Sequence, residues 1–130
     1  MSDKPKYRKK KRERIVSLFS FLPLDKQAAI DHWLRGRKQY REIKNADFVF
    51  VSPPKAGRTW LRVTLSGFFQ TRFGTPAGEL LGFDNLHRIN ADVPRIRFTD
   101  DRYVSAYTGN RDSKRDYYNS RVLLLVRDPR

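Results

Sequence analysis

The chain has 130 residues, 28 of them lysine or arginine against 14 acidic residues, and it has no cysteine. This length suits one domain with its own hydrophobic core, and the lack of cysteine excludes a disulfide framework, a cysteine nucleophile and a zinc site built on cysteines. The longest apolar run, Val122 to Val126, is far shorter than the ~20 residues that a membrane-spanning helix needs, so we expect no transmembrane segment.

The net charge of +14 is concentrated in the first third of the chain. Residues 1–46 carry 14 basic and 5 acidic side chains, whereas residues 47–130 carry 14 and 9. Residues 1–14 show no apolar period, so we interpret them as a solvated arm, which is either a solubilising tail or a contact for an anionic surface. We expect a cytoplasmic protein whose basic N-terminus can hold it at the surface of a membrane.

An apolar segment, Ile15 to Leu22, follows this basic stretch and imitates a signal peptide. No small-residue cleavage pattern comes after it, so an amphipathic helix is the better interpretation. Asp25 is then expected to cap a helix that runs to about Ile43, with Gly36 weakening its middle. The first predicted region, residues 1–46, is therefore a basic arm followed by N-terminal helices.

A different pattern begins at Asp47. The wholly apolar run Phe48 to Val51 is typical of a strand that is covered on both faces. The segment Ser52 to Arg58 interrupts it, and helical spacing resumes at Thr59 and stops where Phe73 to Pro76 supply a glycine and a proline. Strand, loop and helix in this order predict the opening of a βαβ unit.

Two further strands are predicted, at Arg95 to Thr99 and at Val122 to Val126. The polar stretch Ser105 to Ser120 between them is expected to be a loop with one helical turn near Ser113. Apolar strands separated by long connections favour a parallel sheet, and the sequence therefore predicts an α/β fold. The three strands would then end at one edge, where ligands of such folds bind. Charged residues follow each strand: Lys55, Asp100, Asp101 and Arg127.

The first of these loops has the chemistry of an anion site. A loop that joins a buried strand to a helix offers free backbone N–H groups and the positive end of the helix dipole. Gly57 allows close approach of the backbone, Thr59 can donate a hydroxyl, and Lys55 and Arg58 add positive charge. The order is not that of the Walker A motif, because Lys55 precedes the glycine. An ordinary turn with incidental basic residues is the alternative.

Two segments make a family resemblance visible. Pro54 to Leu61 resembles the P-K-[SA]-G-x-T-W-L loop of sulfotransferases, and Val126 to Arg130 resembles the family's second signature, a strand ending in R-[DN]-P. The chain is most similar to the bacterial sulfotransferase-domain type. The resemblance covers residues 47–130 and not residues 1–46. It implies a P-loop-like parallel sheet with flanking helices, which would form the N-terminal part of a sulfotransferase domain.

The resemblance also implies the activity. The family transfers a sulfuryl group from 3′-phosphoadenosine 5′-phosphosulfate (PAPS) to an acceptor hydroxyl or amine, generally without a metal. Lys55 would be catalytic, stabilising the bridging oxygen as the sulfuryl group leaves, and Arg127 would hold the 3′-phosphate. The residues implied to bind the nucleotide are Lys55, Ala56, Gly57, Arg58, Thr59, Trp60 and Arg127. The nucleotide donor and an unknown acceptor are the expected partners.

The sequence departs from the family pattern at two places. Related sequences read T-H-D after the second strand, with histidine as the implied base, but this chain has Asp100 at that position. Aspartate is a weaker base than histidine near neutral pH. Asp100 is therefore either the catalytic base or a loop residue of an impaired enzyme, and His87 is a less favoured substitute. The chain also stops at Arg130, so we expect an incomplete, truncated domain with weakened nucleotide binding.

A second function of another class stays open. Clustered lysine and arginine suffice for nonspecific binding of phosphate, so the chain is alternatively a basic module that binds nucleic acid or an anionic surface without catalysis. Aromatic residues among the basic ones, such as Trp33 and Tyr40, are consistent with this alternative. No recognisable nucleic-acid-binding motif supports it, and nucleic acid is the less favoured partner.

Overall fold

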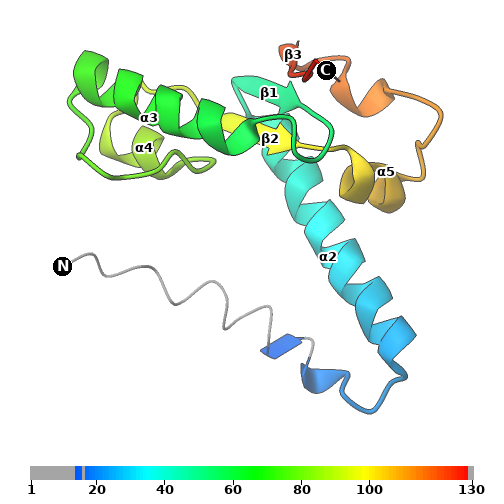
Figure 1. Cartoon of the computed structure of the whole chain (residues 1–130). Helices are drawn as coiled ribbons and strands as arrows, with labels where there is room; N and C mark the ends of the chain where they lie inside the picture. Colours follow the sequence, from blue (N-terminus) through cyan, green and yellow to red (C-terminus); the bar gives the residue numbers. More distant parts are fainter. Residues whose placement is uncertain (1–13, 16, 129–130) are drawn as a thin grey trace.

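The protein is described by a computed structural model that covers residues 14–15 and 17–128. It has a mixed α/β fold in which helices flank a small parallel sheet (Figure 1). The elements in chain order are α2 (Leu24–Asn45), β1 (Phe48–Val51), α3 (Arg58–Phe73), α4 (Asn85–Ile89), β2 (Ile96–Thr99), α5 (Arg102–Thr108), the 3-10 helix η1 (Arg115–Tyr117) and β3 (Val122–Leu124).

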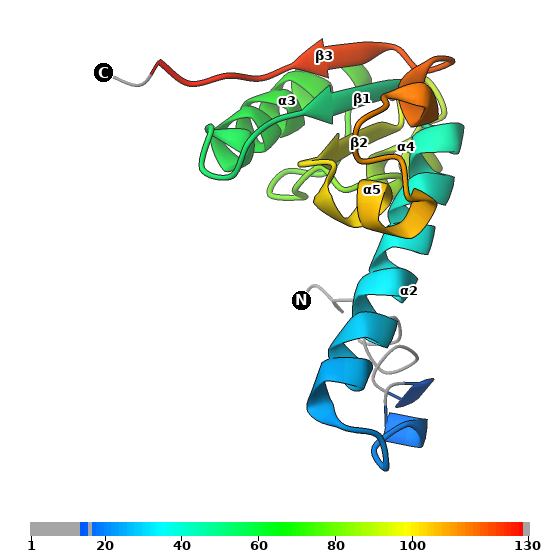
Figure 2. The ribbon, with the colours of Figure 1, turned by 90° about the vertical axis from the view of Figure 1, so that its right-hand side faces the viewer.

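The sheet has three strands in the order β2-β1-β3, with both neighbours parallel to β1. Phe50 on β1 lies opposite Phe98 on one side and Leu123 on the other. All three carboxyl ends therefore meet at one edge, which lies on the left in Figure 2. This confirms the predicted α/β fold with a parallel sheet. Strand β3 is shorter than predicted, although the backbone N–H of Leu125 still bonds the carbonyl of Val51 at 2.9 Å.

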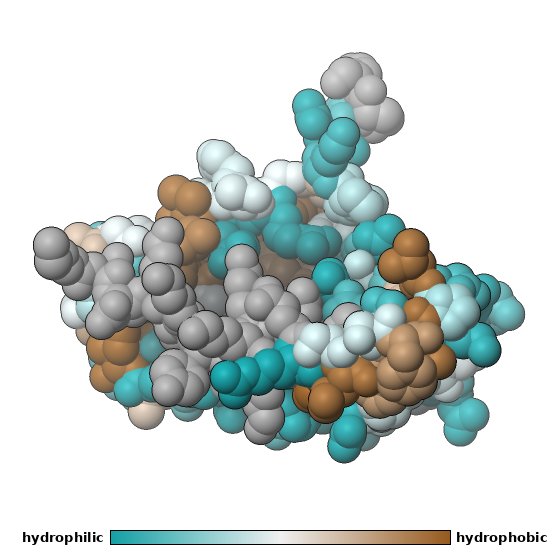
Figure 3. Space-filling model, turned by 90° about the horizontal axis from the view of Figure 1, so that it is seen from below, coloured by the Kyte–Doolittle hydropathy of each residue, from teal (hydrophilic) through white to brown (hydrophobic). Residues whose placement is uncertain are grey.

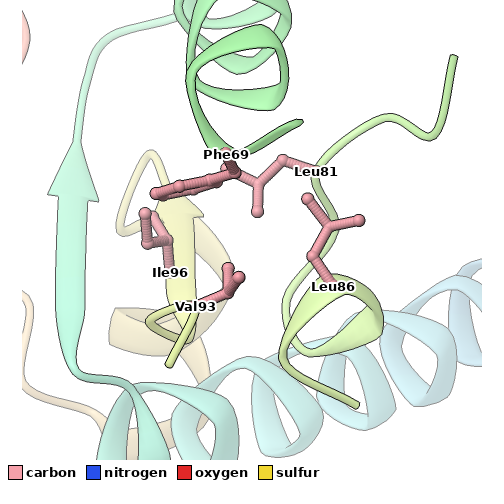
Figure 4. Close-up of a cluster of buried hydrophobic side chains, with 5 residues drawn as sticks. All are labelled: Phe69, Leu81, Leu86, Val93 and Ile96. Atoms are coloured by element: carbon pink, nitrogen blue, oxygen red, sulfur yellow. The ribbon is translucent and has the colours of Figure 1, made fainter. Parts of the chain in front are cut away.

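One face of the sheet is covered by α3 and α4. The aromatic residues Phe48 and Phe50 point to this side and pack against a buried cluster. Figure 4 shows the members of that cluster, which come from α3, the loop after it, α4, the turn before β2 and the first residue of β2: Phe69, Leu81, Leu86, Val93 and Ile96. Burial of these side chains fixes α3 on the sheet, and α3 begins at the carboxyl edge.

The opposite face is covered by α2 and α5. Val49, which is fully buried, packs there with Ile43 of α2 and Val104 of α5. The predicted cap of α2 is wrong, because Pro23 precedes the helix and Asp25 lies in its first turn without a capping bond. An acidic residue in that turn still interacts favourably with the helix dipole.

The stretch Ser105 to Ser120 is not simply a loop. Helix α5 occupies its beginning, and η1 lies two residues beyond the predicted turn near Ser113. Val104 is the buried residue of α5, so the sequence contains too little apolar periodicity to reveal this helix. Helix α4 has only five residues and buries only Leu86, so it too leaves no periodic signal in the sequence.

The outer strand of the sheet is poorly covered. The side chains of β3 are all exposed, with Leu124 at 70%. The strand is held by its backbone bonds to β1 and not by burial of its side chains. Strand β3 therefore presents an apolar surface at the edge of the sheet.

Within the described residues, no helix is both long enough and apolar enough to cross a membrane.

Gly36, in the middle of α2, lies where α5 packs too closely for a larger residue. A β-carbon placed there would meet the backbone oxygen of Tyr103 at 2.3 Å and the β-carbon of Tyr107 at 2.5 Å. Gly67, in the middle of α3, has open space around it. The glycine that weakens α2 locally therefore allows the close approach of α5.

We expect Gly36→Ala to destabilise the protein by about 1 to 3 kcal/mol, because the added methyl overpacks the contact between α2 and α5. The matched substitution Gly67→Ala should stabilise it by about 0.5 to 1 kcal/mol through helix propensity alone. Chemical unfolding followed by circular dichroism measures both. Equal effects of the two substitutions would contradict the packing role of Gly36.

Candidate functional site

The loop between β1 and α3 has an unusual backbone. Lys55 has a φ of +61° and Gly57 a φ of +92°, both in the left-handed region. Ala56 between them is buried, whereas the side chain of Lys55 is exposed. A left-handed conformation is costly for a residue with a side chain, and such residues cluster at functional sites. The loop turns its lysine outward at the carboxyl edge of the sheet.

The N-terminus of α3 is open. Gly57 precedes the helix and provides no side chain, no side-chain cap bond forms with any described residue, and the first turn contains no acidic residue. Thr59 is exposed, and Trp60 has 72% of its surface accessible. The first backbone N–H groups and the positive end of a helix of 16 residues therefore face the loop without a negative partner.

The side chain of Arg58 is used inside the loop. Its Nε and Nη2 atoms donate to the hydroxyl of Ser52 at 3.1 and 3.0 Å, and Nη2 also donates to the carbonyl of Ser52 at 3.1 Å. Ser52 is buried and directly follows β1. Part of the Arg58 guanidinium is thus engaged within the loop, while its backbone N–H lies at the open start of α3. The role of Ser52 was missed, and its place directly after a buried strand was the only signal.

Lys55 and Arg127 differ from Arg58 in how their side chains are engaged. Within the described part of the chain, neither side chain forms a hydrogen bond or an ion pair, and both are exposed. They follow β1 and β3, which are adjacent and parallel. In Figure 2 the segments after these strands leave the same edge, one turning back into α3 and the other continuing outward. Both cations therefore remain available to an anionic ligand at one edge of the sheet.

A hollow of about 290 Å³ lies elsewhere, between α3 and the loop after it. Its lining includes Val63, Gln70 and Leu80, and none of the predicted nucleotide-binding residues. The carboxyl edge is thus marked by its charges and backbone, and not by this hollow.

Three arginines create a positive field near this edge. Burial lowers the pKa of Arg97 on β2, the ion pair with Glu42 opposes this effect, and the neighbouring charges of Arg58 and Arg62 lower it further. Burial and Arg58 also lower the pKa of Arg62. Arginine nevertheless stays charged. Sequence reasoning missed Arg97, although its alternation with Ile96 and Phe98 places it on the opposite face of β2.

Asp100 directly follows β2 at the same edge. Its side chain is 15% exposed and accepts a bond from Nη2 of Arg102 at 3.2 Å. The negative charge of Asp100 also raises the pKa of Arg97. Asp100 is therefore a carboxylate among arginines at the place where the family pattern implies a base.

The neighbouring Asp101 supports the fold. It has a φ of +70°, and its carboxylate accepts bonds from Lys114 at 2.5 Å and from the hydroxyl of Tyr117 at 2.6 Å. Burial raises the pKa of Tyr117 well above its ordinary value, and the bond to Asp101 raises it further. Asp101 thus ties η1 to the start of α5.

His87 is not at this edge. It lies on α4, and its Nδ1 is 2.7 Å from the carbonyl of Val93, which precedes β2 and so lies towards the amino ends of the strands. The described residues contain no group of three or more histidine or acidic side chains that could hold a metal ion.

The structure therefore brings the loop of residues 55–60, Asp100 and the segment with Arg127 to one edge of the sheet, and leaves His87 away from it. A scan against protein-family models and searches of curated proteins and of solved structures find no match to this chain. The candidate site thus stands on its own geometry and on the two sequence motifs.

We expect Tyr117→Phe to lower the free energy of unfolding by about 1 to 3 kcal/mol at pH 7, because Asp101 loses a buried hydrogen bond. The exposed neighbour provides a control, Tyr118→Phe, which should change it little. A raised pKa in the folded state means that stability is lost as the pH rises above about 10, where an unfolded tyrosine ionises. Urea unfolding at pH 7 and at a pH above about 10 measures this effect. The difference in unfolding free energy between wild type and Tyr117→Phe should be smaller at the higher pH. A difference that is constant or grows would contradict this role.

Proposed function

We propose that residues 47–130 form the nucleotide-binding part of a PAPS-dependent sulfotransferase domain with a P-loop-like sheet. The observation that carries the proposal is the pairing of β1 with β3, which puts the loop of Lys55 and the segment of Arg127 at one edge. These are the two segments that resemble the family's signatures, and they lie far apart in the sequence. An arrangement of this kind suits a ligand with phosphates at both ends.

The residues present fit such a donor. Backbone N–H groups at the open start of α3, from Arg58, Thr59 and Trp60, would hold the 5′-phosphate, because anions bind at helix N-termini. Lys55 would contact the bridging oxygen of the phosphosulfate, and Arg127 the 3′-phosphate. The arginines behind the loop add long-range attraction for an anion.

The reaction would be a transfer between two oxygens. The bond from sulfur to the bridging oxygen of the donor breaks, a bond from sulfur to the acceptor oxygen forms, and adenosine 3′,5′-bisphosphate leaves. Lys55 would stabilise the charge on the leaving oxygen, and Asp100 would take the proton of the acceptor hydroxyl. PAPS supplies the activated sulfuryl group, so positioning and charge stabilisation would do most of the work. We place this activity in the cytoplasm, with an acceptor hydroxyl or amine.

Adenosine 3′,5′-bisphosphate is the direct probe of this proposal. We expect Lys55→Ala to weaken its binding about tenfold to a hundredfold, as removal of a charge-assisted contact does. Lys26→Ala, which removes an exposed lysine on α2, should leave the affinity unchanged. Isothermal titration calorimetry measures both. Similar affinities of the two variants and the wild type would mean that the loop is an ordinary turn.

Asp100→Asn tests the proposed base. We expect kcat for sulfuryl transfer from PAPS to fall about a hundredfold or more, because general-base catalysis is lost, while the affinity for adenosine 3′,5′-bisphosphate stays nearly constant. Release of the bisphosphate in the presence of a panel of hydroxyl acceptors measures the rate. Asp92→Asn, at an exposed loop position, serves as the control. An unchanged kcat in Asp100→Asn would remove Asp100 from the mechanism.

A further inference from the structure

The beginning of α2 projects from the rest of the molecule. Its C-terminal half packs on α5 and β2, and the ring contacts with α5 start at His32 and Trp33, which lie 5.2 Å from Tyr103 and 5.5 Å from Tyr107. In Figures 1 and 2 the first two turns of α2 extend away from the sheet and from the other labelled helices. This end of the helix is therefore held away from the sheet and its core.

A hydrogen-bonded turn precedes the projecting end. The N–H of Ser20 bonds the carbonyl of Ser17 at 3.2 Å, and the N–H of Leu22 bonds the carbonyl of Phe19 at 2.9 Å. From the first turn of α2, the amide of Gln27 donates to the carbonyl of Leu22 at 2.8 Å. These bonds fix the turn against the start of the helix.

This turn holds three large apolar side chains in water. Leu18, Phe21 and Leu24 are 72%, 78% and 83% exposed, and we call them the apolar tip. Figure 3 shows brown apolar surface at the lower right of the view, beside teal hydrophilic surface, where this end of α2 lies. Three such exposed side chains within the short segment from Leu18 to Leu24 indicate a surface for a partner.

A strongly basic segment precedes the apolar tip in the sequence. Positions 1–14 contain eight basic and two acidic residues. Among the described residues, Arg14, Asp25 and Lys26 are exposed close to the tip in the sequence. The apolar side chains therefore directly follow a segment with a strong excess of positive charge.

This combination selects among the possible occupants. A second copy of the chain would bring two strongly basic segments together, so like-charge repulsion opposes it. A nucleic acid would satisfy the charge but would leave the apolar tip in water. A bilayer with anionic headgroups satisfies both, because apolar side chains enter the boundary between headgroups and acyl chains while basic side chains contact the phosphates.

We propose that the apolar tip docks this protein on the surface of an anionic phospholipid bilayer, with the basic residues that precede it in the sequence as the electrostatic contact. The helix α2 then acts as a spacer that keeps the sheet and its carboxyl edge off the membrane. The inference is independent of the proposed sulfuryl transfer, since it uses none of the residues of that site.

The experiment is co-sedimentation of the full chain with vesicles. Vesicles of phosphatidylcholine containing about one-third phosphatidylserine should bind the wild type, and pure phosphatidylcholine vesicles should bind it at least about tenfold more weakly. The triple substitution Leu18→Ser, Phe21→Ser and Leu24→Ser keeps every charge. It should weaken binding to the anionic vesicles by about tenfold or more, because apolar area no longer enters the bilayer.

A matched triple variant controls for loss of exposed apolar surface in general. Val63→Ser, Ile89→Ser and Val126→Ser remove exposed apolar side chains from α3, α4 and the segment after β3, and should leave vesicle binding unchanged. Circular dichroism verifies that both triple variants are folded. Should the tip variant unfold, the single substitution Phe21→Ser takes its place, with an expected weakening of severalfold.

Other outcomes would overturn the proposal. Undiminished binding of the tip variant to the anionic vesicles would show that charge alone is responsible. Equal binding of wild type to a DNA duplex, unaffected by the tip substitutions, would favour a nucleic acid. Sedimentation of wild type without vesicles, abolished in the tip variant, would favour a second copy of the chain.

Discussion

The parallel pairing of β1 with a strand on each side organises this protein. Backbone hydrogen bonds place Phe50 between Phe98 and Leu123. This register determines which residues follow the strands at the carboxyl edge of the sheet. Because parallel strands run in one direction, segments separated by more than forty residues in the sequence finish together. The fully buried Val49 anchors the central strand by packing on α2 and α5, while α3 covers the other face.

The basic side chains near the carboxyl edge fall into two kinds: some hold the structure together, and others have no partner among the described residues. Arg58 binds Ser52 and holds the loop in place, and the partly buried Arg97 forms an ion pair with Glu42. Both arginines keep their positive charge near this edge. Lys55 and Arg127 lack such internal partners within the described residues, so the field of the partly buried arginines would add to the attraction of these two exposed cations for an anion.

Apolar side chains are distributed unevenly over the molecule. The sheet and the helices bury a conventional core, yet β3 and the turn before α2 leave leucine, valine and phenylalanine in water. Burial of apolar surface is favourable wherever a partner offers it, so both places are suited to contacts that the isolated fold does not make. The turn before α2 differs from β3 in the basic sequence that precedes it, and this difference in charge is the basis for proposing an anionic bilayer as its partner.

The sequence by itself determined the parallel α/β architecture, the three strands, α3 and the loop that precedes α3, because apolar runs, glycines and prolines are local signals. It could not reveal α5, which buries little beyond Val104, or the engagement of Arg58 with Ser52. Gly36 is the clearest case: locally it only weakens a helix, and the contact with Tyr103 explains it. Strand order, the partners of each arginine and the isolation of the apolar tip were decided by tertiary structure, because each depends on which distant segments pack together.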